Sequence, residues 1–164
     1  MSETRNLNAM AKSIESAEPR CQVWRTLDIV GEKWSLLIVR NALRGQTRFS
    51  QFRDQLGIPS DILTARLNTL VAAGIFEKQA YREPGSRERY SYQLTEAGLG
   101  LKLVIASFIQ WGDEFNPSPH GVASILTEPS TSQKVELAYV AEDGHRVPGT
   151  DVATLPGPAS IVVW

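Results

Sequence analysis

Arginine side chains gather in one part of this 164-residue chain, and guanidinium groups bind the phosphate oxygens of nucleic acids. Residues 40–90 carry nine basic and five acidic side chains, a local net charge of +4, although the whole chain has a net charge of −1. Attraction between exposed charges acts over a Debye length of about 10 Å, so local charge matters more than the sum. This segment is therefore expected to attract a polyanion.

Small and polar side chains share one face of a helix expected at residues 60–73. Leu63, Leu67 and Leu70 lie on the other face, where they would point inward. At about 100° per residue, the outer face carries Asp61, Ala65, Asn68 and Ala72, with Thr64 and Thr69 on either side. Such side chains let the helix approach the edges of DNA bases closely. The alternative is a solvated helix face without a partner.

A helix, a tight turn, a second helix and a hairpin position these residues. The first helix is expected at residues 49–56 and ends at Gly57; Ser60 takes the N-cap position of the second, which Gly74 ends. Two β-prone runs follow at residues 75–81 and 89–94, joined by a turn, and this hairpin carries Arg82, Arg87 and Arg89. The order predicts a winged helix-turn-helix, whose second helix enters a major groove while the hairpin reaches the flanking backbone.

Three more helices are expected around this motif. Residues 21–30 are amphipathic, residues 34–43 are apolar enough to form the centre of the core, and residues 95–115 are apolar well beyond one stripe. One domain covers only one side of such a helix, so the remainder should be buried in a homodimer. The residues expected at that contact are Val23, Trp24, Leu103, Phe108, Trp111 and Phe115. The alternative is burial of the helix under the C-terminal extension.

The predicted fold class is α+β, mainly α: a winged helix-turn-helix domain at residues 20–115, with a long C-terminal dimerisation helix. Residues 1–19 lack hydrophobic periodicity, which predicts a flexible N-terminal arm. Residues 116–164 contain six prolines and have a net charge of −3. The alternation of Val135, Leu137 and Tyr139 predicts two or three short strands in a small β-rich extension.

The residue types present do not favour an enzyme or a membrane protein. His120 and His145 have no suitable nucleophile or set of metal ligands near them, and there is no glycine-rich phosphate loop. We therefore expect no catalytic residue, no metal and no cofactor. No apolar run approaches the roughly 20 residues that cross a bilayer, and the N-terminus lacks a signal-peptide pattern. The single cysteine, Cys21, fits a reducing cytoplasm.

A series of short motifs follows in a fixed order between Cys21 and Trp111. They are Gly31-Glu32-Lys33-Trp34, Arg48-Phe49 with Phe52, the frame Leu63, Leu67, Leu70 and Gly74, and Tyr92, Leu94-Thr95 and Gly98. In combination they resemble the HxlR-type family of bacterial winged helix-turn-helix transcription regulators. The chain departs from that family at the wing, where Arg87 and Glu88 stand in place of paired prolines, so the shape of the wing is expected to differ.

The resemblance implies a homodimer on a palindromic operator in double-stranded DNA, with half-sites roughly 34 Å apart. Within that frame, phosphate contacts are expected from Arg48, Ser50 and Arg53, and base-edge contacts from Thr64, Ala65 and Asn68. Ser60, at the start of the second helix, is also expected to belong to the DNA-binding surface. Arg66 would bind a phosphate or form an internal ion pair. Arg87 and Arg89 would contact the backbone or the minor groove, unless they are merely solvated surface.

Cys21 leaves two interpretations open. It is either an inert small side chain in a core helix or, as the resemblance implies, a sensor of oxidants or electrophiles whose thiolate Arg20 and Arg25 favour. The hypothesis for the whole chain is a cytoplasmic DNA-binding regulator, with repression the commoner activity in the family. The alternatives are a winged-helix module for protein–protein contact and a small-molecule effector site in the extension, near Trp111, Tyr139 and Trp164.

Overall fold

The computed structural model describes residues 21–85 and 87–158, so the arm expected at residues 1–19 and the side chain of Trp164 lie outside the described residues. The fold class, α+β and mainly α, is confirmed, and the helix-turn-helix and wing elements match their predicted ranges to within one residue. The elements are α2 (Gln22–Val30), α3 (Lys33–Leu43), α4 (Phe49–Leu56), α5 (Ser60–Ala72), β1 (Phe76–Tyr81), β2 (Arg89–Leu94), α6 (Glu96–Gly100), α7 (Lys102–Phe115), β3 (Tyr139–Val140), β4 (Arg146–Val147) and the 3₁₀ turn η1 (Gly149–Asp151).

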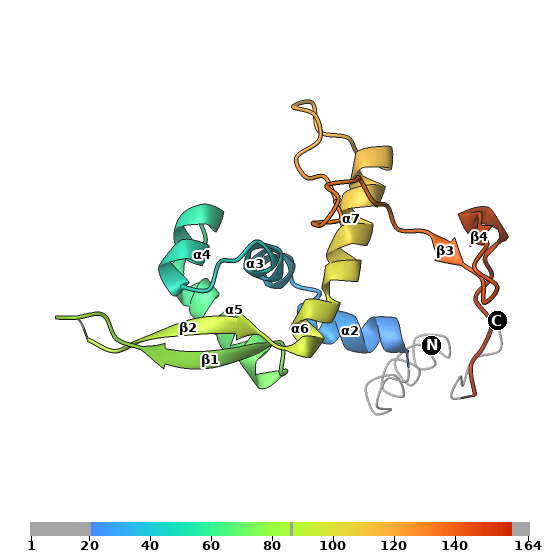
Figure 1. The fold of residues 1–164 in the computed structure, drawn as a ribbon. Coiled ribbons are helices and arrows are strands. Elements are labelled where there is room, and N and C mark those ends of the chain that lie inside the picture. Colours follow the sequence, from blue (N-terminus) through green and yellow to red (C-terminus); the bar gives the residue numbers. More distant parts are fainter. Residues whose placement is uncertain (1–20, 86, 159–164) are drawn as a thin grey trace, which may run out of the picture.

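Helix α3 runs through the middle of the fold, between α4 and α7 (Figure 1). Its Ile38 and Val39 are fully buried, which confirms the prediction of a central helix. The leucine face of α5 belongs to the same apolar cluster. Phe52 of α4 and Phe76 of β1 join it, with their rings edge to face at a centroid separation of 6.4 Å. The core therefore holds both helices of the turn motif and the base of the wing together.

The turn between α4 and α5 depends on the left-handed backbone of Gly57, whose φ is 61°. The amide of Gly57 donates to the Arg53 carbonyl at 2.9 Å. The expected N-cap at Ser60 is wrong by one residue, because Pro59 caps α5 and Ser60 is its first residue. The Pro59 carbonyl accepts the Leu63 amide at 2.9 Å, so the hydroxyl of Ser60 is not used as a cap.

The wing is an antiparallel pair in which Tyr81 lies opposite Arg89 and Phe76 opposite Leu94. A short third segment joins it from the loop before α4: Arg48 forms an antiparallel bridge with Ser91, and the Tyr92 amide donates to the Thr47 carbonyl at 2.7 Å. The hairpin is thus fixed by backbone hydrogen bonds to the start of the helix-turn-helix. In Figure 1 its free end projects well beyond the helices.

The single helix expected at residues 95–115 is wrong, because the chain forms two helices there. Helix α6 ends at Gly100 and α7 begins at Lys102, with Leu101 between them at ψ −7°. Leu101 is buried in the core, and two glycines weaken α6, since glycine in a helix costs about 1 kcal/mol relative to alanine. A turn that buries Leu101 therefore replaces a continuous helix.

Thr95 connects the end of α5 with the start of α6. Its hydroxyl donates to the Gly74 carbonyl at 2.6 Å and accepts the Gly98 amide at 3.1 Å. A Cβ on Gly98 would lie 2.3 Å from the Ile75 carbonyl oxygen and 2.8 Å from a methyl carbon of Leu94. Only glycine fits at this close approach, which explains the Thr-x-x-Gly spacing of the last motif.

Within residues 116–158, the extension contains the antiparallel pair β3–β4, in which Tyr139 lies opposite Val147, and an isolated antiparallel bridge between Thr127 and Lys134. Of the alternating residues expected to form a strand, only Tyr139 does so; Val135 and Leu137 lie outside the strands. The side-chain amide of Gln110 pairs with the backbone of Leu137, accepting its N–H at 2.9 Å and donating to its carbonyl at 3.1 Å. Beyond this attachment the β3–β4 hairpin lies on the side of α7 away from the wing (Figure 1).

The alternative in which the extension buries the last helix is wrong. Leu103, Phe108, Trp111 and Phe115 of α7 remain between 57 and 65% exposed, although Gln110 of the same helix is hydrogen-bonded to the extension. The apolar face of α7 is therefore open in the single chain.

Stability measurements on two glycine variants test whether crowding at Gly98 excludes a side chain there. Gly98→Ala should lower the free energy of unfolding by about 1–3 kcal/mol or more, because the new Cβ overlaps backbone that cannot move away. Gly100→Ala is the matched control: nothing lies within 4 Å of its Cβ, so the helix should gain up to about 1 kcal/mol. Equal effects in chemical denaturation would show that the crowding at Gly98 is unimportant.

Candidate nucleic-acid interface

Helix α5 presents the polar face that its sequence predicts. Thr64, Ala65 and Asn68 are exposed, while the leucine face is fully buried. The Thr64 hydroxyl donates to the Ser60 carbonyl at 2.7 Å, so its proton is used within the helix while its oxygen can still accept a hydrogen bond. The amide of Asn68 has no hydrogen-bond partner within the described part of the chain, so both of its polar atoms are available to a ligand.

Helix α4 brings Ser50 and Arg53 to the surface beside α5, and both are exposed. The guanidinium of Arg53 donates to the carboxylate of the adjacent Asp54 at 2.8 Å. This hydrogen bond and the attraction of the carboxylate raise the pKa of Arg53 above its ordinary value. Arg53 therefore remains cationic, but a carboxylate accompanies it.

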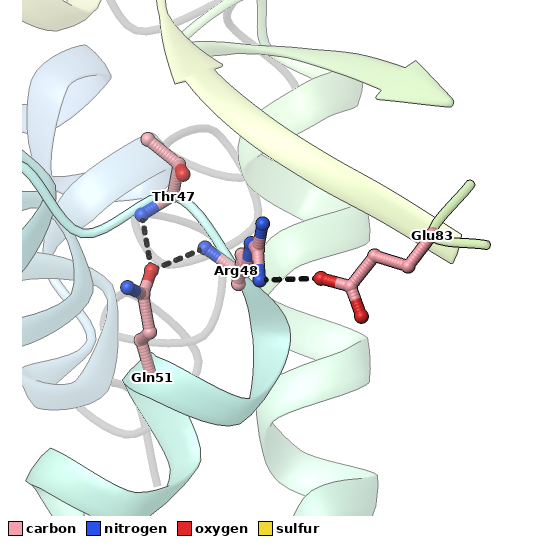
Figure 2. A network of polar contacts seen from close by, with 4 residues as sticks. All are labelled: Thr47, Arg48, Gln51 and Glu83. Carbon is pink, nitrogen blue, oxygen red and sulfur yellow. Dashed lines mark hydrogen bonds and ion pairs between the residues drawn. The ribbon is translucent and has the colours of Figure 1, made fainter. Parts of the chain in front are cut away.

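Arg48 lies where α4 meets the wing, as Figure 2 shows. The side-chain oxygen of Gln51 accepts the Thr47 and Arg48 amides, each at 2.9 Å, and fixes the backbone there. The Arg48 guanidinium donates to Glu83 at 2.8 Å and lies 4.8 Å from the ring centroid of Tyr81. Sequence reasoning missed both partners, because 35 residues separate Arg48 from Glu83 and no local pattern connects them.

The wing carries further exposed cations. Arg87 and Arg89 are exposed and, among the described residues, neither forms an ion pair. The ammonium of Lys78 lies 4.0 Å from the ring centroid of Tyr90, so this pair stiffens the hairpin by a cation–π contact that sequence reasoning also missed. The exposed arginines therefore project from a pair of strands held together by backbone hydrogen bonds and by this contact.

Arg66 points away from the polar face of α5. Its guanidinium lies 3.4 Å from the carboxylate of Glu32, which caps α3, and its Nε atom is buried without a partner. The sequence predicts that Arg66 either binds a phosphate or forms an internal ion pair, and the structure contains the ion pair. The contact joins α5 to the loop between α2 and α3.

Two helices leave apolar faces open to solvent. Each of α2 and α7 has one buried residue, Val30 and Ala106 respectively. Val23, Trp24, Leu27, Leu103, Phe108, Trp111 and Phe115 are each between 51 and 67% exposed. On α7 the apolar residues Val104, Phe108, Trp111 and Phe115 repeat at intervals of four, three and four positions, the spacing of a helix that packs along another helix. These seven exposed side chains, with Val104, are called the open apolar face below.

Cys21 is exposed at the N-cap position of α2, so it does not belong to the core of the single chain. The described residues contain no group of three or more histidine, cysteine or carboxylate side chains able to hold a metal ion. Within the same residues, every helix is too short or too polar to span a lipid bilayer.

Residues 29–119 match the family model described as HxlR-like helix-turn-helix. The chain belongs to this family. An uncharacterized HTH-type transcriptional regulator of Mycobacterium tuberculosis, Rv3095, is 38% identical to it over 83% of this chain and 85% of that protein. By family and fold, the protein is a helix-turn-helix transcriptional regulator, as the sequence resemblance predicts.

Solved structures extend the similarity to the whole fold. The candidate transcription factor PA1607 has 35% sequence identity and a TM-score of 0.73, over 84% of this chain and 95% of that one. The redox regulator HypR in its reduced form has 30% identity and a TM-score of 0.52, over 57% of this chain and 92% of that one. The likeness to PA1607 thus includes much of the extension, whereas the likeness to HypR is confined to a shorter region.

Proposed function

We propose that this regulator is a homodimer that binds a palindromic operator in double-stranded DNA and represses transcription by occupying it. The observation that carries the proposal is the exposed polar face of α5, a helix that packs against both α4 and β1, with exposed arginines on α4 and on the wing. A major groove about 12 Å wide admits one α-helix, and flanking cations then meet the phosphates on either side.

The roles of individual residues follow from their exposure. Asn68, with its amide unpaired, forms a bidentate contact with adenine, and Thr64 places its methyl group against a thymine methyl. Ala65 and Ser60 let the helix approach the base edges closely. Ser50, Arg53, Arg87 and Arg89 bind phosphates or the minor groove and set the position of α5 without reading sequence. Arg66, held by Glu32, serves the fold and not the DNA.

The open apolar face supports the dimer. Seven large apolar side chains on α2 and α7 are each more than half exposed in one chain, which is more apolar surface than isolated proteins usually leave in water. The four-three-four spacing on α7 suits a twofold contact in which α7 packs along its counterpart, with Val23, Trp24 and Leu27 of α2 beside it. Such a dimer presents two α5 helices for half-sites roughly 34 Å apart.

Cys21 is proposed as the point at which an oxidant or electrophile acts on the regulator. Its thiol is exposed at the start of α2, the helix that contributes Val23 and Trp24 to the open apolar face. A change at this end of α2 therefore reaches the proposed dimer contact directly. The similarity of this chain to a protein described as a redox regulator supports this role for Cys21.

Titration of a random-sequence duplex with the wild-type protein at about 50 and 200 mM salt tests the proposal. Three or four phosphate-binding cations in each protomer should cost roughly 10³–10⁵ in affinity between those concentrations, because bound counterions are released. A footprint on the intergenic DNA beside its own gene would then locate the operator. Weak binding that ignores salt would instead favour a winged-helix module for protein–protein contact.

Asn68→Ala should relax the base preference at one position of each half-site. Loss of the bidentate contact should reduce discrimination by about 1–3 kcal/mol while the salt dependence remains nearly unchanged. The measurement is affinity for the operator and for single-base variants of it.

Arg89→Ala provides the contrast, since it should weaken binding to every sequence and reduce the salt slope by about one unit per protomer. Arg146→Ala is its control, because Arg146 pairs with Glu136 in the extension. A uniform loss of affinity in the Asn68 variant would contradict its assigned role.

Phe108→Asp should convert the dimer to monomers, because it places a charge in the open apolar face. Sedimentation at micromolar concentration measures this, and circular dichroism should show an unchanged helix content. Ile125→Asp is the matched control: Ile125 is 64% exposed, similar to Phe108 at 57%, but it lies in the extension. A Phe108 variant that sediments like the wild type would place the dimer contact elsewhere.

Cys21→Ser should leave DNA binding in reductant unchanged and should abolish any response to the thiol oxidant diamide. Diamide takes two electrons and two protons from a pair of thiols as they form a disulfide, and a serine hydroxyl cannot replace either thiol. Electrophoretic mobility shifts with and without diamide provide the comparison. A response that persists in the variant would end the sensor role of Cys21.

A further inference from the structure

Arg48 is held in place by contacts from both sides of the helix-turn-helix. Its backbone bridges to Ser91 of β2 and is capped by Gln51, so its Cα position is fixed. Its side chain lies near the Tyr81 ring and ends on the Glu83 carboxylate (Figure 2). The guanidinium therefore lies where the start of α4 and the outer end of β1 come together.

The contact with Glu83 cancels the charge that Arg48 would bring to DNA. The Nη1–Oε1 separation of 2.8 Å is also the distance at which a guanidinium binds a phosphate oxygen. A carboxylate and a phosphodiester each offer anionic oxygens to the same donors. Glu83 thus occupies, in the free protein, the position that a phosphate of the DNA backbone would take.

The ion pair is weak enough to be exchanged. The side chains of Arg48 and Glu83 are 48% and 46% exposed, and pairs this exposed change an equilibrium constant by about fivefold at most. The duplex has the stronger field, because phosphates are closely spaced along both strands. Contact with DNA should therefore release Glu83 from Arg48.

We propose that Arg48 and Tyr81 form a seat for a backbone phosphate flanking each half-site, and that Glu83 fills this seat until DNA displaces it. The proposal rests on the DNA-binding function proposed above. Glu83 lies next to the Pro84-Gly85 turn, so its release also frees the end of the wing from α4. Arg53 differs, because its partner Asp54 is its neighbour in the chain and links it to no other element.

Glu83→Gln tests the seat, since it removes the competing charge and preserves the shape of the side chain. The variant should bind duplex DNA about two- to fivefold more tightly than the wild type at low salt. Glu88→Gln is the matched control: Glu88 is exposed on the same hairpin and, among the described residues, has no ion pair. It should have a clearly smaller effect. Thermal unfolding checks that both variants fold.

A double-mutant cycle separates the seat from general repulsion. In an Arg48→Gln background, Glu83→Gln should no longer change the affinity, because no cation remains for the two anions to share. The same gain in both backgrounds, or equal gains from Glu83→Gln and Glu88→Gln, would overturn the proposal. Weaker binding by Glu83→Gln would also overturn it, since Glu83 would then be needed to position Arg48.

The wild-type titration keeps the two proposals apart. If the wild type binds duplex DNA with strong salt dependence but the cycle shows no coupling between Arg48 and Glu83, the seat fails and the DNA-binding function stands. If the wild type shows no salt-dependent binding, the function fails and the seat fails with it.

Discussion

Burial of three leucines determines which way α5 faces. Leu63, Leu67 and Leu70 are fully buried, and burial of each contributes about 1.5–3 kcal/mol relative to exposure. Because these side chains hold one side of the helix against the core, Thr64 and Asn68 have to face outward. The same packing places α5 beside α4 and the base of the wing, so that cations from both elements flank its polar face.

Elements that depend on neighbouring residues are predictable from this sequence. The two helices of the turn and the wing strands follow from apolar spacing and from Gly57 and Gly74, all within short windows. The break at Leu101 is not predictable in this way, because the apolar pattern continues through it and the cause is packing against distant elements. The exposure of Cys21 is equally hidden, since α2 looks like a core helix but buries only Val30 in the single chain.

The candidate site shows the same division. The outward face of α5 follows from helical periodicity, whereas the pairing of Arg48 with Glu83 depends on the wing folding back toward α4. A count of charges over residues 40–90 therefore overstates what is available to a polyanion. Arg48, Arg53 and Arg66 each have a carboxylate partner, and Arg40 is half-buried against the side chain of Asn41.

The interruption at Leu101 has a geometric consequence for the assembly. Helix α7 follows α6 after one residue, and Leu101 at that position is buried in the core that also holds α3 and α5. In a pair of subunits joined along α7, the anchoring of Leu101 and the packing of α7 against α3 would together set the angle between the shared contact and each helix-turn-helix. The distance between the two α5 helices would then depend on the same core cluster that orients each of them.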